Sequence, residues 1–308
     1  MALDPAIDVI DKRFHRYAIH NAHIDHLWTG GRWTEGPVYV PAGRYLLFSD
    51  IPNDRVMRYD EVTGQTHVFE QPAWNRNGHC LDLEGRVVAC EHRGRAVTRT
   101  GHDGRREVLA QSIEGKRLNS PNDVVVHPDG GVWFTDPTYG IDSDYEGDRA
   151  KSELDGSYVY RIDPDGSIAA VVTDMVRPNG LAFSPDRSIL YVADTGISHV
   201  GRDCPPDIRA YPIAPDGRSL TGDWSTFATC TAGVFDGFRV DIHGNLWTSA
   251  EDGVHCYAPD GVLLGKIRIP EVVANVEFGG PKRNRLYICA TTGLYAMYVR
   301  TRGCTPLD

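Results

Sequence analysis

The sequence predicts an all-β fold, a six-bladed β-propeller whose four-stranded blades surround a central channel. A polar residue followed by two short apolar runs recurs six times along the 308 residues. The recurring units begin 42, 45, 57, 57 and 39 residues apart, which suits propeller blades with insertions in the third and fourth. A short turn rich in Gly, Pro, Asp and Asn joins the two apolar runs of each unit, which is typical of a β-hairpin.

Each unit opens with a side chain that carries an oxygen acceptor, and a strand-like run follows it directly. The opening residues are Glu35, Asn77, Asn122, Asn179, Asp236 and Asn275. The second runs cover residues 45–50, 86–91, 131–136, 189–194, 246–251 and 285–290. A β-sandwich would give no reason for these equivalent hairpins.

Further strand-like runs between the units are expected to form the outer strands of the blades. They cover residues 56–59, 96–99, 158–162, 208–213 and 254–257. Two polar, turn-rich stretches, residues 141–152 and 196–207, are expected to be inserted surface loops. Residues 20–28 are expected to pair with the last blade, which would remove exposed strand edges. The chain is therefore predicted to be one domain over residues 1–308, with residues 1–28 helping to close the ring.

Composition excludes several classes of partner. The net charge is −10, with 42 acidic and 32 basic residues and no basic block, so neither nucleic acid nor an anionic membrane is expected. The N-terminal stretch lacks a secretory apolar core, and no apolar run is long enough to span a bilayer. Seven widely spaced cysteines without a Cys-x-x-Cys pair favour reduced thiols in a cytoplasmic protein, with one disulfide left open. A monomer and a small homo-oligomer both remain open.

The opening residues predict a metal site. The innermost strands of a propeller run in the same direction, so these six side chains should lie together at one mouth of the channel. Hard divalent cations such as Ca²⁺, Mg²⁺ and Mn²⁺ prefer oxygen ligands, and the carboxylates of Glu35 and Asp236 would balance the charge. Zinc is disfavoured because no His/Cys cluster has ligand spacing. The alternative is that these residues serve only as turn residues.

The second runs end at the same mouth, and almost all of them end in a carboxylate. These end residues are Asp50, Glu91, Asp136, Asp194, Glu251 and Ala290. The carboxylates would support the metal ligands, bind a hydroxyl-rich substrate, or cap neighbouring loops.

Four motifs resemble the senescence-marker-protein/gluconolactonase family. They start at Glu35 (Glu-Gly-Pro), Ser120 (Ser-Pro-Asn-Asp), Arg177 (Arg-Pro-Asn-Gly) and Asp236 (Asp-Gly-Phe-Arg), and the resemblance extends to about Ala290. Residues 111–137 look closest to bacterial gluconolactonases.

The resemblance implies one divalent ion, with Ca²⁺ favoured and Mn²⁺, Mg²⁺ or Zn²⁺ open in vitro, and hydrolysis of a sugar lactone. It places metal ligands at Glu35, Asn179 and Asp236, with Asp236 also the general base. Asn122 is implied to contact the substrate or a metal-bound water. The chain departs from animal members at Ser120, where they carry an arginine.

Together these features predict metal-assisted opening of a lactone to its hydroxy acid. The ring hydroxyls would be oriented by Asn122, His79, Arg117 and Asp136. One alternative is the aryl-ester or organophosphate hydrolysis of similar calcium propellers, and another is a propeller that serves only as a binding scaffold. No Gly-x-Ser-x-Gly elbow, P-loop or dinucleotide fingerprint is present.

Overall fold

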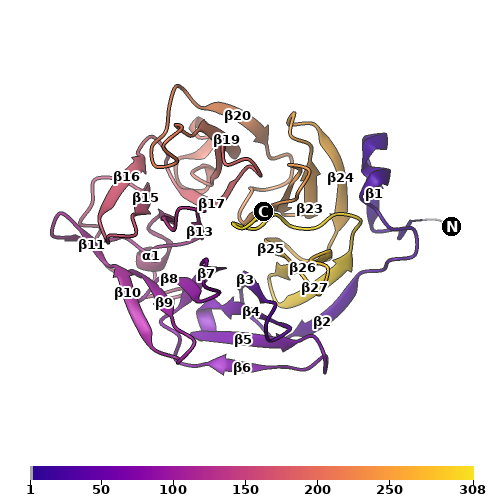
Figure 1. The fold of residues 1–308 in the computed structure, drawn as a ribbon, viewed down its shortest axis with the longest axis horizontal. Coiled ribbons are helices and arrows are strands. Elements are labelled where there is room, and N and C mark those ends of the chain that lie inside the picture. The colour runs from indigo at the N-terminus through magenta and orange to yellow at the C-terminus, as the bar shows by residue number, and fades with distance from the viewer. Residues whose placement is uncertain (1–2) are drawn as a thin grey trace.

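The computed structural model describes residues 3–308, apart from the side chain of Arg202, and it is a six-bladed β-propeller (Figure 1). Within these residues, six antiparallel sheets stand in a ring, and the first strands of the six units contact one another around a central channel. The predicted fold class is therefore confirmed.

The blades follow one another in chain order. The first is β3 (Thr34–Val40), β4 (Tyr45–Asp50), β5 (Arg55–Asp60) and β6 (Thr66–Glu70), and the second is β7 (Arg76–Leu81), β8 (Val87–Glu91), β9 (Ala96–Thr100) and β10 (Arg106–Ala110). The third is β13 (Val124–Val126), β14 (Val132–Asp136), β15 (Tyr158–Ile162) and β16 (Ile168–Val172), and the fourth is β17 (Pro178–Phe183), β18 (Ile189–Asp194), β19 (Asp207–Pro212) and β20 (Ser225–Thr229).

The last two blades complete the ring. The fifth is β21 (Phe238–Val240), β22 (Leu246–Ala250), β23 (Gly253–Tyr257) and β24 (Leu263–Arg268), and the sixth is β25 (Val273–Gly279), β26 (Arg285–Ala290), β27 (Gly293–Tyr298) and β2 (Asp25–Thr29). A small hairpin and short helical turns lie between the blades: β11 (Ser112–Ile113), β12 (Lys116–Arg117), α1 (Tyr139–Asp142), α2 (Ile197–Val200), η1 (Lys12–Arg16), η2 (Ile51–Asn53) and η3 (Gly201–Asp203).

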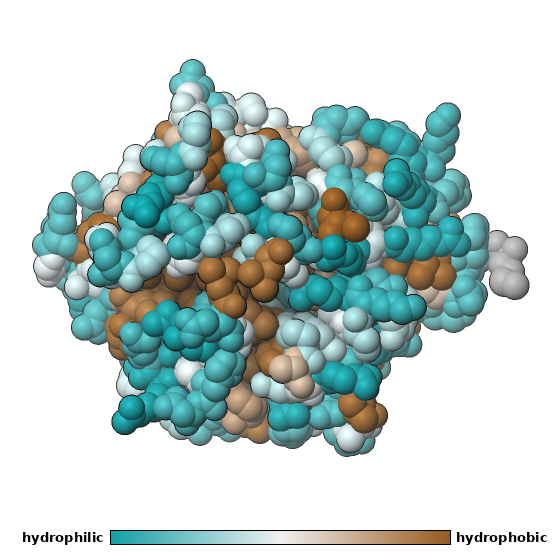
Figure 2. Space-filling view, viewed as in Figure 1, coloured by the Kyte–Doolittle hydropathy of each residue, from teal (hydrophilic) through white to brown (hydrophobic). Residues whose placement is uncertain are grey.

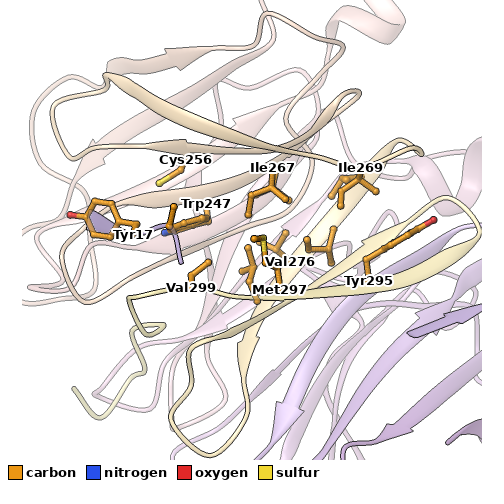
Figure 3. Packing of buried hydrophobic residues seen from close by; sticks show 14 of the residues in the cluster. Tyr17, Trp247, Cys256, Ile267, Ile269, Val276, Tyr295, Met297 and Val299 are labelled. Carbon is orange, nitrogen blue, oxygen red and sulfur yellow. The ribbon is translucent and has the colours of Figure 1, made fainter. Parts of the chain in front are cut away.

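The hydrophobic core lies between neighbouring blades. The second strands β14, β22 and β26 are buried along their whole length, because each presents apolar side chains to the blades on both sides. Between the fifth and sixth blades, Trp247 packs among Val276, Met297 and their neighbours (Figure 3). Burying each such side chain contributes about 1.5–3 kcal/mol, so every interface between blades stabilises the ring.

The N-terminal segment adds one strand to each of the two last blades. Strand β2 pairs with β27, with Asp25 opposite Ala296 and Thr29 opposite Gly293. The chain therefore joins its N-terminal and C-terminal parts within one blade. Strand β1 (Ile7–Val9) also pairs with β24 and adds a fifth strand to the fifth blade, which the sequence pattern did not predict.

The described residues contain neither a membrane-spanning helix nor a disulfide. No helix between residues 3 and 308 is long and apolar enough to cross a membrane. The seven cysteines are all unpaired in the structure.

Candidate active site

The inner strands approach one another very closely at one mouth of the channel. The amide of Gly78 donates to the carbonyl of Asn122 at 2.8 Å, and the amide of Gly180 donates to the carbonyl of Asp236 at 3.1 Å. A Cβ atom on Gly180 would lie only 2.1 Å from that carbonyl oxygen. The glycine after the opening residue thus lets neighbouring strands bring their opening side chains together.

Five of the six opening residues line one cavity of about 170 Å³ at this mouth. The lining residues are Trp33, Glu35, Asn77, Asn122, Tyr139, Glu146, Asn179, Thr195, Ser198, Val234 and Asp236. Asn275 is not among them, but its amide donates to Glu35 Oε2 at 2.9 Å. The structure therefore brings Glu35, Asn122, Asn179 and Asp236 to one place.

A chain of amide hydrogen bonds orients the asparagines. Asn77 Nδ2 donates to Asn122 Oδ1 at 2.6 Å, and Asn122 Nδ2 donates to Asn179 Oδ1 at 2.7 Å. Asn77 Oδ1 is buried and accepts no hydrogen bond from residues 3–308. Each amide oxygen has two lone pairs, so the oxygens in this chain keep acceptor capacity toward the cavity.

The cavity holds three carboxyl groups and no basic side chain among its lining residues. Burial, and next the nearby Asp123, raise the pKa of Asp236 from its ordinary value of 3.8 to about 8. Burial, followed by Asp236 and Asp123, raises the pKa of Glu35 well above its ordinary value. Burial, followed by Asp142, raises the pKa of Glu146 to about 7. Ionised carboxylates placed here need a positive charge that the protein does not supply.

This donor set fits a hard divalent cation. The described residues contain no cluster of three or more His, Cys, Asp or Glu side chains arranged for a metal, so a site here has to include amide oxygens. Glu35 and Asp236 with Asn179 and Asn122 could hold such an ion, since two carboxylates and neutral oxygens suit Ca²⁺. The set does not suit a zinc site of His and Cys ligands.

Three residues expected to bind substrate lie elsewhere. His79 follows Asn77 by two positions on β7, and it is buried with Nδ1 2.8 Å from the carbonyl oxygen of Gly36. Burial lowers the pKa of His79 to about 3. Arg117 is exposed on the β11–β12 hairpin, and Asp136 is buried and accepts a hydrogen bond from the backbone of Asn119. None of the three lines the cavity.

The other carboxylates at the ends of the second strands mainly hold neighbouring loops. Asp50 accepts from the Arg32 amide, and Asp194 accepts from the amides of Val176 and Arg177. Glu91 forms a bidentate pair with Arg106. The contacts of Asp50 and Asp194 match the loop-capping alternative, whereas Glu91 pairs with the outer strand β10 of its own blade.

Two inserted loops form one wall of the cavity, and the sequence did not predict which of their side chains line it. Glu146 lies in the loop after β14 that also contains α1, and Ser198 lies in α2 after β18. Arg177, just before β17, links the two loops: its Nη1 lies 3.0 Å from Asp142 Oδ2, and its carbonyl accepts a hydrogen bond from the Thr195 amide at 3.0 Å. The extra length of the third and fourth repeats predicts inserted loops at this mouth. It does not predict which side chains of these loops face the cavity.

The close approach at the mouth makes a testable prediction. Gly36 has a φ of +54°, and a Cβ there would lie 1.8 Å from the carbonyl oxygen of Asn77. Gly36→Ala should therefore lower the free energy of unfolding by about 3 kcal/mol or more, measured by urea denaturation. Gly64→Ala is the matched control, because Gly64 has a φ of +71° and open space around it. That control should cost only about 1 kcal/mol, and equal losses would contradict the steric argument.

The family of the chain follows from comparison with known proteins. Residues 33–292 match the model of the SMP-30/gluconolactonase/LRE-like region. A gluconolactonase from Zymomonas mobilis is 32% identical over 294 residues, which cover 88% of this chain and 80% of that protein. A pentonolactonase from Haloferax volcanii is 31% identical over 271 residues, which cover 86% and 84%. The solved structure of a gluconolactonase from Xanthomonas campestris is 36% identical, covers 95% of this chain and 94% of that one, and superposes with a TM-score of 0.87. The chain therefore belongs to the SMP-30/gluconolactonase/LRE-like family, as its motifs indicated.

Proposed function

We propose that this protein is a metal-dependent lactonase that hydrolyses a sugar lactone to the aldonic acid. The observation that carries the proposal is the cavity at the channel mouth, where Glu35, Asp236 and Glu146 converge without a basic side chain. Relatives that cover most of the chain are named gluconolactonase and pentonolactonase, which supports a sugar lactone as the substrate class.

The ligands of the ion would be Glu35, Asn179 and Asp236, with Asn122 beside them, and Ca²⁺ is favoured over Mn²⁺, Mg²⁺ and Zn²⁺. When bound, a divalent ion supplies Lewis acidity that stabilises negative charge on the carbonyl oxygen of the lactone. The amide chain from Asn77 through Asn122 to Asn179 fixes the direction of these ligands before substrate arrives.

Asp236 is the proposed general base. Its carboxylate would take a proton from the water whose oxygen attacks the lactone carbonyl carbon. The ring C–O bond then breaks, and the proton passes from Asp236 to the departing ring oxygen, which becomes a hydroxyl. Water and lactone are thereby converted to one hydroxy acid, without any other reactant.

The wall formed by the inserted loops is proposed to select the substrate. Glu146, Thr195 and Ser198 present a carboxylate and two hydroxyls to the cavity, and Tyr139 adds a phenol that is hydrogen-bonded to Thr195. Such groups suit a ligand with several hydroxyls. His79, Arg117 and Asp136 have no part in this proposal, because they do not reach the cavity.

The chain is further proposed to act in the cytoplasm, as a monomer or small homo-oligomer and without nucleic acid or membrane as a partner. The seven cysteines, unpaired in the structure, suit a reducing compartment.

Binding of the ion should release protons. In the metal-free protein the raised pKa of Asp236, about 8, keeps its carboxyl largely protonated at pH 7. The pKa of Glu35 is raised as well. Because a bound cation requires ionised ligands, each Ca²⁺ should displace about one to two protons at pH 7. Calorimetric titration in two buffers with different ionisation enthalpies measures that number. Release of no protons would contradict the proposed ligands.

The same raised pKa sets a stability trend. Between about pH 4 and pH 8 the Asp236 carboxyl of the folded metal-free protein holds a proton that it has lost in the unfolded chain, so this group makes the free energy of unfolding fall as pH rises through this range. Added Ca²⁺ should oppose that fall, since it binds the ionised carboxylates. Thermal unfolding at pH 6 and pH 8, with chelator and with Ca²⁺, checks both trends.

A substrate panel tests the reaction class. Acid release from δ-gluconolactone, corrected for spontaneous opening, is compared with release from an aryl ester and an aryl phosphotriester. The proposal expects the lactone to have the highest kcat/KM. Preference for the ester or phosphotriester would favour the alternative hydrolase, and no turnover of any of the three would favour a binding scaffold.

A further inference from the structure

A second and larger cavity lies at the opposite mouth of the channel. Its volume is about 300 Å³, and the far ends of inner strands from all six blades reach it. The C-terminal segment from Cys304 to Leu307 also lines it. In the view of Figure 1 the C-terminus lies in front of the channel, and Figure 2 shows apolar side chains gathered near the centre of that face.

Charged side chains inside the channel separate this cavity from the proposed active site. Arg239 Nε donates to Glu277 Oε2 at 2.8 Å, and Arg239 Nη1 lies 3.8 Å from Asp123 Oδ2. Asp123 directly follows Asn122, which lines the active-site cavity. Arg239 and Glu277 line only the second cavity, so the two cavities do not share their charged groups.

The walls of the second cavity are mostly apolar. The first five blades each offer one or two such side chains: Val38, Tyr39, Leu81, Leu83, Val125, Val126, Ala182, Phe183 and Val240. A pocket of this size with apolar walls and few polar groups is typical of small-molecule sites.

One guanidinium in the cavity is left without a hydrogen bond. Among the lining charges, Asp82 is bound by Arg86 at 2.7 Å, and Arg187 donates to the carbonyl oxygen of Thr305. Arg283 also lines the cavity, yet its side chain makes no hydrogen bond within residues 3–308, and its Nε is buried without a partner. The paired carboxylate oxygen, Glu277 Oε1, lies 3.7 Å away, which is beyond hydrogen-bonding distance.

The C-terminal segment completes the cavity rather than merely lying near it. The amide of Cys304 donates to the carbonyl of Val240 at 2.9 Å, and Arg302 pairs with Asp308 at 2.7 Å. Arg187 reaches the same segment from the fourth blade. Leu307 is 78% exposed at the edge, where an apolar ligand could cover it.

We propose that this cavity binds a small amphiphilic monocarboxylate, with its carboxylate on Arg283 and its alkyl chain against the strand ends. The lining residues include three arginines and two carboxylates, Asp82 and Glu277. Asp82 is already paired with Arg86, which lies outside the lining. Positive charge is therefore in excess, and the site favours an anion. A carboxylate could accept from the free Nη donors of Arg283, whose side chain is 25% exposed, and an alkyl chain suits the apolar walls. This site is independent of lactone hydrolysis.

Calorimetric titration with decanoate, below its micelle concentration, tests the proposal on the whole protein. The expected result is one saturable site with an affinity at least tenfold higher than for decanol, which has the same chain without the charge. Arg283→Met should remove that advantage while decanol binding stays unchanged. Arg218→Met is the matched control, because Arg218 is exposed on a turn and does not line the cavity.

A second variant locates the ligand. Leu83 lies on the β7–β8 turn at the edge of the cavity, so Leu83→Trp should block it and abolish binding of both decanoate and decanol. Circular dichroism and thermal unfolding establish that each variant folds. Absence of saturable decanoate binding by the unmodified protein, or equal binding by Arg283→Met, would overturn the proposal.

Discussion

Asp236→Asn is expected to lower kcat for δ-gluconolactone by roughly 10²–10⁴-fold at saturating Ca²⁺. Asparagine keeps the size and one oxygen of the side chain, but it cannot accept the proton of the attacking water. The rate is measured by acid release at constant pH, with spontaneous opening of the lactone subtracted. Asp223→Asn is the matched control, because Asp223 is exposed and lies outside the cavity, and it should keep full activity.

The pH dependence of activity distinguishes the loss of a general base in Asp236→Asn from a structural effect of the substitution. The unmodified enzyme should lose activity as pH falls, because its base becomes protonated, while the residual activity of Asp236→Asn should lack that limb. Full activity in Asp236→Asn would contradict the assigned role. Low activity with an unchanged pH profile would also contradict it and would point to a structural effect.

Removal of divalent ions is expected to reduce lactone hydrolysis to the uncatalysed background. The carboxyl group of Asp236 would then become largely protonated at pH 7, because burial raises its pKa to about 8, and burial also raises the pKa of Glu35. Returning Ca²⁺ should restore the rate, and excess Ca²⁺ should raise the Tm of the chelated protein by about 5–10 °C. Rates in chelator that equal those in Ca²⁺ would contradict metal dependence, and a Tm that Ca²⁺ does not change would contradict the site.

Much of the site could be predicted because the propeller repeats. Glu35, Asn77, Asn122, Asn179 and Asp236 open successive hairpins, and inner strands that run in the same direction place such residues at one mouth. The repeat alone does not decide which way each side chain turns. Asn275 occupies the equivalent position, yet its amide supports Glu35 from outside the cavity.

The residues that the sequence could not assign depend on contacts between distant segments. In the sequence, His79 lies close to an opening residue and Asp136 ends a second strand, so both are expected at the mouth. In the structure, His79 is 1% exposed beside β3, and Asp136 is fully buried and accepts a hydrogen bond from the Asn119 backbone. Glu146 enters the cavity from an inserted loop whose path is set partly by His92, with Nδ1 3.1 Å from the Glu146 carbonyl oxygen. No local pattern records such a contact.

A calorimetric Ca²⁺ titration of the chelator-treated protein beside Glu35→Gln shows directly whether the channel mouth holds a metal ion. Glu114→Gln is the matched control, since Glu114 is exposed on the β11–β12 turn and does not line the cavity. The unmodified protein and the control are expected to bind one Ca²⁺ per chain, and Glu35→Gln is expected to bind it at least tenfold more weakly. Equal binding by all three proteins, or no binding by the unmodified protein, would contradict a metal site at the mouth of the channel.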